Sequence, residues 1–130
     1  MNILLVEDNP ADVRLIQEML KDVEIATSLV VVNNGEEALA FLRREDQYAG
    51  AAAPDIILLD IHLPRKDGYE VLTEIRRDPA LRGIPVAVCI GSELEKERLE
   101  AYQLPGECVF VKSFDPQQLA QTLLNCRAAA

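Results

Sequence analysis

Five short apolar runs alternate with longer amphipathic segments along the chain. The runs are NILLV (2–6), SLVVV (28–32), DIILL (55–59), PVAVCI (85–90) and CVFV (108–111). Each run is apolar nearly throughout instead of alternating with polar residues, which is typical of strands that are covered on both faces. The pattern therefore predicts a parallel sheet with helices packed on both sides.

The segments between the runs carry helix boundary signals. Asn9 followed by Pro10 is typical of a helix start, and a later helix is predicted over residues 69–77. Ser92 followed by Glu95 has the S-x-x-E pattern of a capping box, which predicts that the fourth helix begins there. Predicted strands and helices thus alternate along the chain.

The predicted elements fit one domain. A chain of 130 residues can bury a core of its own but is short for two ordinary domains. Right-handed crossovers limit the topologies of a (βα)5 unit, and the doubly wound, flavodoxin-like strand order 2-1-3-4-5 is the simplest. We expect residues 1–130 to form one such α/β domain, with a loose loop at 45–54 and no effector domain.

The composition is acidic. The 13 basic and 22 acidic residues give a formal net charge of −9. Because this charge repels a phosphate backbone, and no cluster of Lys or Arg marks a local exception, direct binding to nucleic acid is not expected.

The cysteines and the N-terminal segment bear on the location of the protein. Cys89, Cys108 and Cys126 are odd in number and lack C-x-x-C spacing, so we expect reduced core residues and neither a disulfide nor a zinc site. The segment MNILLVED has no basic flank or cleavage site, and no apolar run is long enough to cross a membrane. These features predict a cytoplasmic protein without a membrane partner.

Acidic side chains follow the first and third runs, and a lysine follows the fifth. Glu7 and Asp8 come directly after the first run, Asp60 after the third and Lys112 after the fifth. In the predicted order the first and third strands are neighbours, and ligands bind at their carboxyl ends. Two like charges about 4 Å apart cost about 4 kcal/mol at an effective dielectric near 20, so a cation is expected. Oxygen ligands of this kind suit Mg²⁺.

This combination indicates phosphoryl chemistry. A carboxylate can act as the nucleophile while a metal ion and a lysine neutralise charge on the transferring oxygens. Asp60 is the best candidate because it ends the central strand and is followed by the tight loop IHLPRKDG. The plainer alternative is that these acidic residues only mark polar loops.

Three segments carry a resemblance to a known family. ILLVEDNP, IILLDIHLPRKDG and VFVK resemble the acidic pair, the phosphoacceptor strand and loop, and the lysine of the response-regulator receiver domain of two-component signalling. The resemblance runs from residue 2 to about residue 127. The segment DNPADVRLIQEML and the long loop before the third run are similar to those of single-domain receivers associated with bacterial phytochromes.

The resemblance implies roles for individual residues. Asp60 would accept a phosphoryl group from a histidine kinase, and Lys112 would pair with the phosphoryl oxygens. Asp8, Asp60 and the backbone carbonyl of His62 would hold Mg²⁺, and Glu7 would bind the metal ion through water. The His62 imidazole is expected to face solvent.

Further contacts and partners are implied as well. Ile61 and the backbone amide of Gly91 are expected to contact the bound phosphoryl group. Partners would be a sensor histidine kinase or phosphotransfer protein and an unidentified downstream protein. A homodimer through the fourth helix, fifth strand and fifth helix fits the family, although the charged sequence ELEKERLEAY favours a solvated fourth helix. Self-phosphorylation and self-dephosphorylation would be the only chemistry, so the protein is not expected to be an enzyme acting on other substrates.

Three positions depart from the family pattern. Ile90 stands where receivers place the threonine or serine whose hydroxyl donates to the phosphoryl group, and Val109 stands where an aromatic residue commonly moves inward. Ser113 replaces a proline that follows the lysine across a cis bond, and the isomer of this bond stays open. Ser92 could supply a substitute hydroxyl, but the expected capping box commits its oxygen to the fourth helix. We expect phosphorylation of Asp60 to persist with a weakened or rerouted conformational response.

Two alternatives remain at this stage. A pseudo-receiver that binds proteins without phosphate would account for Ile90, Val109 and Ser113, but it has no need of a repulsive acidic pocket. An enzyme or flavin protein on the same fold is disfavoured because Glu7 and Asp8 would repel a flavin phosphate.

Overall fold

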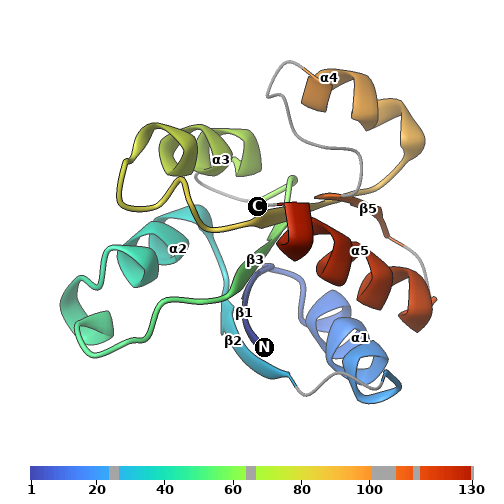
Figure 1. The fold of residues 1–130 in the computed structure, drawn as a ribbon, viewed down its shortest axis with the longest axis horizontal. Helices are drawn as coiled ribbons and strands as arrows, with labels where there is room; N and C mark the ends of the chain where they lie inside the picture. The colour runs from blue at the N-terminus through green and yellow to red at the C-terminus, as the bar shows by residue number, and fades with distance from the viewer. Residues whose placement is uncertain (24–26, 64–66, 101–107, 113–114, 130) are drawn as a thin grey trace.

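The computed structural model describes residues 1–23, 27–63, 67–100, 108–112 and 115–129 (Figure 1). The strands are β1 (Asn2–Val6), β2 (Ser28–Val32), β3 (Ile56–Asp60), β4 (Val86–Ile90) and β5 (Val109–Val111). The helices are α1 (Pro10–Lys21), α2 (Gly35–Leu42), α3 (Gly68–Arg77), α4 (Lys96–Glu100) and α5 (Pro116–Ala129), with 3-10 turns η1 (Asp46–Tyr48) and η2 (Glu93–Glu95). None of these helices is both long and apolar enough to cross a membrane.

The sheet has the predicted topology. All five strands are parallel in the order β2-β1-β3-β4-β5, which confirms the doubly wound arrangement. Val6 at the end of β1 is in register with Leu59 of β3, and Asp60 is in register with Cys89 of β4. The carboxyl ends of β1, β3 and β4 therefore lie together at one edge of the sheet.

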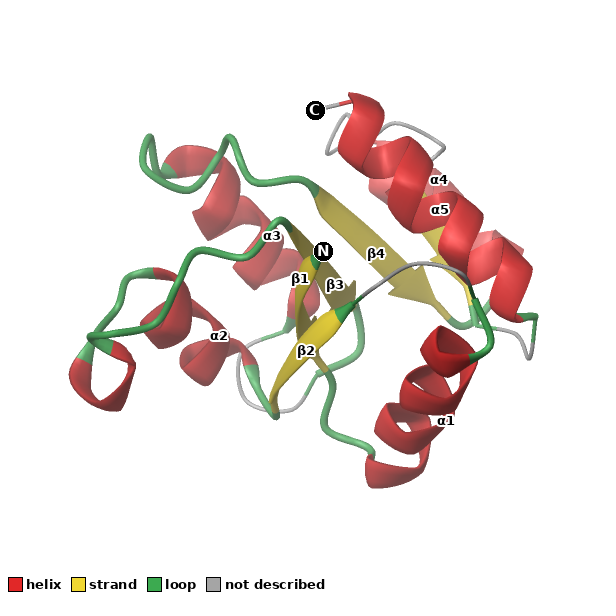
Figure 2. Ribbon diagram, turned by 60° about the horizontal axis from the view of Figure 1, so that its bottom comes forward, coloured by secondary structure: helices red, strands yellow, loops and turns green. Residues whose placement is uncertain are grey.

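Two apolar layers enclose the sheet. Leu4 and Val6 face a core shared with α2, α3 and α4, whereas Ile3 and Leu5 face a core shared with α1 and α5. Figure 2 shows α2 and α3 on one side of the strands and α1 and α5 on the other. Successive side chains of a strand point to opposite faces, so strands buried on both faces require the continuous apolar runs seen in the sequence.

The helix starts agree with the capping signals. The Asn9 side chain accepts a hydrogen bond from the Ala11 amide at 2.9 Å, and Pro10 is the first residue of α1. Proline lacks a backbone N–H, but an N–H at this position would have no partner within the helix. Proline here therefore costs the helix nothing. The loop expected over 45–54 contains the η1 turn, in which Tyr48 packs edge-on against Phe41 with ring centroids 5.3 Å apart.

The predicted capping box at Ser92 is wrong. Ser92 precedes the η2 turn, but its side chain makes no capping hydrogen bond. Glu95 does not reach back to the cap; its Oε1 lies 2.8 Å from Nε2 of His62. This carboxylate has a distant partner in the acceptor loop that a local sequence pattern does not reveal.

The expectation that all cysteines are reduced is also wrong. Cys108, directly before β5, forms a disulfide with Cys126 of α5, and their Cα atoms are 4.7 Å apart. Packing of α5 against the sheet brings together two residues that are 18 positions apart in the sequence. Cys89 is a buried free thiol, and burial raises its pKa, so it stays protonated. The expected cytoplasmic location loses the support that it drew from the cysteines.

Candidate functional site

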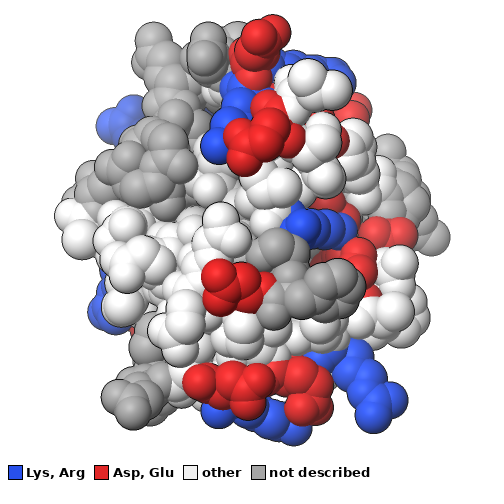
Figure 3. All heavy atoms as spheres, turned by 90° about the vertical axis from the view of Figure 1, so that its right-hand side faces the viewer, with Lys and Arg blue, Asp and Glu red and all other residues white. Residues whose placement is uncertain are grey.

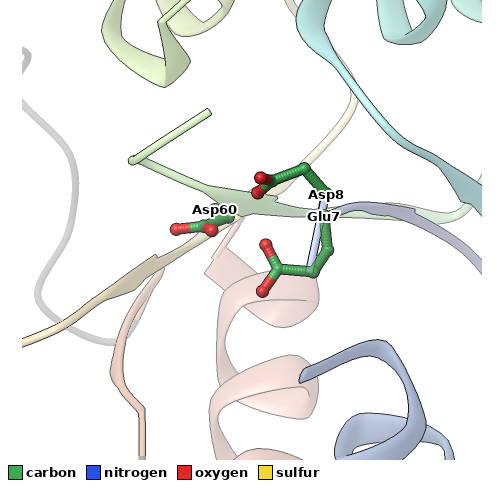
Figure 4. Close-up of side chains that lie close together, drawn as sticks. All are labelled: Glu7, Asp8 and Asp60. Carbon is green, nitrogen blue, oxygen red and sulfur yellow. The ribbon is translucent and has the colours of Figure 1, made fainter. Parts of the chain in front are cut away.

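Three carboxylates meet at the carboxyl ends of β1 and β3. Glu7 and Asp8 follow β1, and Asp60 is the last residue of β3. One ligand oxygen from each lies within 4.8 Å of the others. Figure 4 shows the three side chains close together at the ends of the two strands. Glu7 and Asp60 are 1% and 5% exposed, whereas Asp8 is exposed. The strand ends thus bring together the acidic residues that the sequence singled out.

Lys112 completes this cluster from the far side of β4. Its backbone amide donates to the carbonyl of Ile90 at 2.9 Å, which extends the pairing of β4 with β5 by one residue. Its Nζ lies 3.0 Å from Glu7 Oε1 and 3.2 Å from Asp60 Oδ2. The predicted meeting of the lysine with the acidic residues is therefore present in the structure.

The sequence reasoning missed one further partner of Lys112, which lies outside the acidic cluster. Asp12, in the first turn of α1, places Oδ2 2.9 Å from Nζ of Lys112. Acidic residues are common in the first turn of a helix because they complement its dipole, so the sequence position alone indicates nothing further.

Burial and crowding of negative charge dominate the electrostatics. Burial raises the pKa of Glu7 to about 9, and the neighbouring Asp60 carboxylate adds to this rise. Burial by itself would lower the pKa of Lys112, but hydrogen bonds to Asp12 and Glu7 and the charge of Asp60 raise it above its ordinary value. The hydrogen bond from Lys112 lowers the pKa of Asp12. The ammonium is therefore firmly charged.

The cluster fits a divalent cation. Glu7 Oε2 is buried and has no hydrogen-bond partner among the described residues. A buried carboxylate oxygen without a partner is costly unless a proton, water or metal ion satisfies it. The donor set of Glu7, Asp8 and Asp60 consists of oxygens alone, which is the chemistry that Mg²⁺ and similar hard cations prefer.

The loop after Asp60 is held close to the acceptor strand. The His62 amide donates to Asp60 Oδ1 at 3.1 Å, and the Gly68 amide donates to the Ile61 carbonyl at 3.1 Å. A Cβ on Gly68 would lie 2.6 Å from both the Asp60 carbonyl oxygen and the Ile61 Cα. Glycine at the start of α3 therefore allows the chain to return against the acceptor.

The structure gives neighbours for Ile61, His62 and Gly91 that the sequence did not predict. The Ile61 amide donates to the Cys89 carbonyl at 3.1 Å, so it is engaged within the sheet, and the expected contact of Ile61 with a phosphoryl group stays a prediction. The His62 side chain is 65% exposed, as expected, but it pairs with Glu95. Gly91 is exposed after β4, and the nearest atom to a Cβ built on it is Glu95 Oε1 at 3.6 Å. Glu95 thus lies beside the predicted phosphoryl contact.

The apolar departures pack together. Ile90 is fully buried and in register with Val111, and Val109 packs against the same core. No hydroxyl stands at the end of β4, while the Ser92 hydroxyl is free of the expected capping bond. Ser113 and its preceding peptide bond lie outside the described residues.

Known proteins are similar to this chain in sequence and fold. The family model for the response regulator receiver domain matches residues 3–124. Response regulator Rcp1 of Synechocystis sp. (strain ATCC 27184 / PCC 6803 / Kazusa) is 45% identical over 111 residues, which cover 85% of this chain and 76% of Rcp1. These matches confirm the resemblance read from the acidic pair, the acceptor loop and the lysine.

Solved structures agree with the sequence matches. The phosphorylated cyanobacterial phytochrome response regulator RcpA is 44% identical with a TM-score of 0.80, over 99% of this chain and 95% of RcpA. The bacteriophytochrome response regulator AtBRR is 34% identical with a TM-score of 0.87, over 96% of this chain and 91% of AtBRR. The chain therefore belongs to the response regulator receiver domain family.

Proposed function

We propose that Asp60 accepts a phosphoryl group from a histidine kinase or phosphotransfer protein in a Mg²⁺-dependent reaction, and that the protein signals through protein contacts. The observation that carries this proposal is the placement of the buried Asp60 carboxylate within reach of two further carboxylates and the Lys112 ammonium. RcpA has been crystallised in a phosphorylated form, and Rcp1 in a Mn²⁺-bound form. The similarity of this chain to both relatives supports the proposal.

Each residue of the site has its own role in the proposed phosphoryl transfer. An Asp60 carboxylate oxygen forms a bond to phosphorus while the bond between phosphorus and the donor atom breaks, and the donor leaves with that electron pair. Glu7, Asp8, Asp60 and the His62 carbonyl would hold Mg²⁺, which supplies positive charge to the transferring oxygens. Lys112 would neutralise a further oxygen, and the Gly91 amide would donate to another.

The charge distribution supports signalling through proteins. On the face shown in Figure 3, Lys and Arg side chains lie beside Asp and Glu side chains and do not gather in one basic patch. Together with the net charge of −9, this pattern fits a protein partner better than a nucleic acid. The downstream partner, and a dimer through α4, β5 and α5, remain proposals.

Phosphorylation can be measured on the intact protein. Incubation with Mg²⁺ and acetyl phosphate should add the mass of one phosphoryl group, and Asp60→Asn should abolish the gain because an amide is a poor nucleophile. Asp22→Asn, which removes an exposed carboxylate at the far end of α1, should leave the gain intact. No mass gain in the wild type, or an equal gain in Asp60→Asn, would contradict the proposal.

The apolar end of β4 predicts a second result. Ile90→Thr should destabilise the unphosphorylated protein by about 1–3 kcal/mol relative to the isosteric Ile90→Val, because it buries a hydroxyl in an apolar core. Phosphorylation should offset part of this cost in the threonine variant, since the hydroxyl then has a charged acceptor. The check is the shift of Tm on phosphorylation, which should be larger for threonine than for valine. Equal shifts would show that a hydroxyl at this position does not sense the phosphoryl group.

A further inference from the structure

The Lys112 ammonium is held by three acidic side chains from three different parts of the fold. Glu7 follows β1, Asp60 ends β3 and Asp12 belongs to α1. Nζ lies 3.0 Å from Glu7, 3.2 Å from Asp60 and 2.9 Å from Asp12. An ammonium has three N–H donors, so these contacts use its full donor capacity. The shortest of the three joins it to the residue outside the acidic cluster.

Asp12 differs from Glu7 and Asp60 because it has no further role in metal binding or phosphoryl transfer. Glu7 and Asp60 belong to the cluster that fits a divalent cation, and Asp60 also supplies the oxygen that would take the phosphoryl group. Both carboxylates therefore exchange or share their contacts with Lys112 during the reaction. Asp12 contributes no oxygen to that cluster, so its bond to the lysine can persist from the free protein to the phosphorylated one.

The element that carries Asp12 is fixed in place. Asp12 is the third residue of α1, which starts with the Asn9 cap and buries Ile16 and Leu20 against the sheet. A long lysine side chain loses rotamer freedom when it is held in one orientation. A carboxylate on a packed helix removes that freedom before the phosphoryl donor arrives, which is how a supporting residue makes a catalytic group more effective.

We propose that Asp12 is a positioning residue that holds the Lys112 ammonium toward Asp60 during phosphoryl transfer. This inference rests on the proposed function of Asp60 as acceptor. Asp12 acts through Lys112: its carboxyl group also interacts with Glu7, but it supplies no ligand oxygen to the metal cluster and does not contact the reacting atoms. Its side chain is 33% exposed, so a neutral isostere should fold normally.

A double-mutant cycle isolates the action of Asp12 through the lysine. With acetyl phosphate and saturating Mg²⁺, Asp12→Asn should slow phosphorylation about tenfold in the wild-type background, and hardly at all in a Lys112→Met background. Asp22→Asn removes the same charge from the other end of α1 and should leave the rate unchanged. An equal loss in both backgrounds, or no loss with Lys112 present, would overturn the proposal.

A second measurement tests the same contact without phosphorylation. Ammonium protons held by hydrogen bonds exchange slowly, so Lys112 should give a side-chain ¹⁵N–¹H NMR signal, which Lys112→Met identifies. Asp12→Asn should broaden or remove this signal, while Asp22→Asn should not. An unchanged signal in Asp12→Asn would overturn the proposal. If the wild type takes up no phosphoryl group, the proposed function fails, and the NMR result still decides whether Asp12 orients the lysine.

Discussion

Gly68→Ala is expected to destabilise the protein by about 3 kcal/mol or more, at the upper end of the cost of overpacking. The added Cβ would lie 2.6 Å from the Asp60 carbonyl oxygen and from the Ile61 Cα, and 2.7 Å from the Ile61 carbonyl oxygen. All three are backbone atoms of the central strand and its exit, so no side-chain rotation relieves the clash. The measurement is urea unfolding followed by circular dichroism, which should show a large fall in the denaturation midpoint.

Gly83→Ala is the matched control for this substitution. A Cβ on Gly83 would have no heavy atom within 4 Å, and no glycine among the described residues has a positive φ. The same methyl group should therefore change stability by no more than about 0.5 kcal/mol, or raise it slightly by restricting the unfolded chain. Similar losses at the two glycines would contradict the close approach of α3 to the acceptor strand.

The fold could be predicted because its strands are buried on both faces. That burial requires continuous apolar runs, and β1 and β2 occupy the same residues as the runs at 2–6 and 28–32. The candidate site followed from topology, since residues directly after parallel strands share one edge of the sheet. Glu7, Asp60 and Lys112 could thus be placed together before their distances were known.

The features that the sequence did not reveal depend on side chains that meet across elements. Asp12 reaches Lys112 only because α1 is rotated so that its first turn faces the end of β5. Glu95 fits a capping box by spacing, but an imidazole 33 residues away competes for its carboxylate. The Cys108–Cys126 pair requires α5 to pack beside β5. Local patterns carry no information about such partners.

The packing of Ile90 and Val109 explains how the structure accommodates these two departures from the family pattern. Ile90 at the end of β4 belongs to the core beneath α2, α3 and α4, and Val109 at the start of β5 packs against the same core. The same α3 and α4 also meet where Arg98 stacks on the Tyr69 ring, 4.0 Å from its centroid. The end of β4 is thus occupied by apolar packing, while the pair of His62 with Glu95 supplies a polar contact beside Gly91.

Mg²⁺ binding is expected to strengthen by up to about 100-fold between pH 6.5 and pH 8.5, if Glu7 supports the metal ion as proposed. The pKa of Glu7 is raised from 4.5 to about 9, mainly by burial, so the folded protein holds a proton there at neutral pH. A cation needs the ionised carboxylate, and each pH unit below that pKa costs up to tenfold in affinity. Isothermal titration calorimetry at the two pH values, in buffers of different ionisation enthalpy, measures both the affinity and the proton released.

The same raised pKa determines the direction in which the stability of the metal-free protein changes with pH. Because the folded state binds this proton more tightly than the unfolded chain, the stabilisation is complete below pH 4.5 and is lost as the pH rises toward 9. Glu7→Gln cannot lose a proton at this position, so its Mg²⁺ affinity should vary little with pH. As the pH rises toward 9, the Tm of this variant without metal should fall less than that of the wild type. Equal Mg²⁺ affinities of the wild type at pH 6.5 and 8.5 would show that Glu7 is already ionised in the free protein. In that case the buried Glu7 Oε2 would need a partner other than a proton.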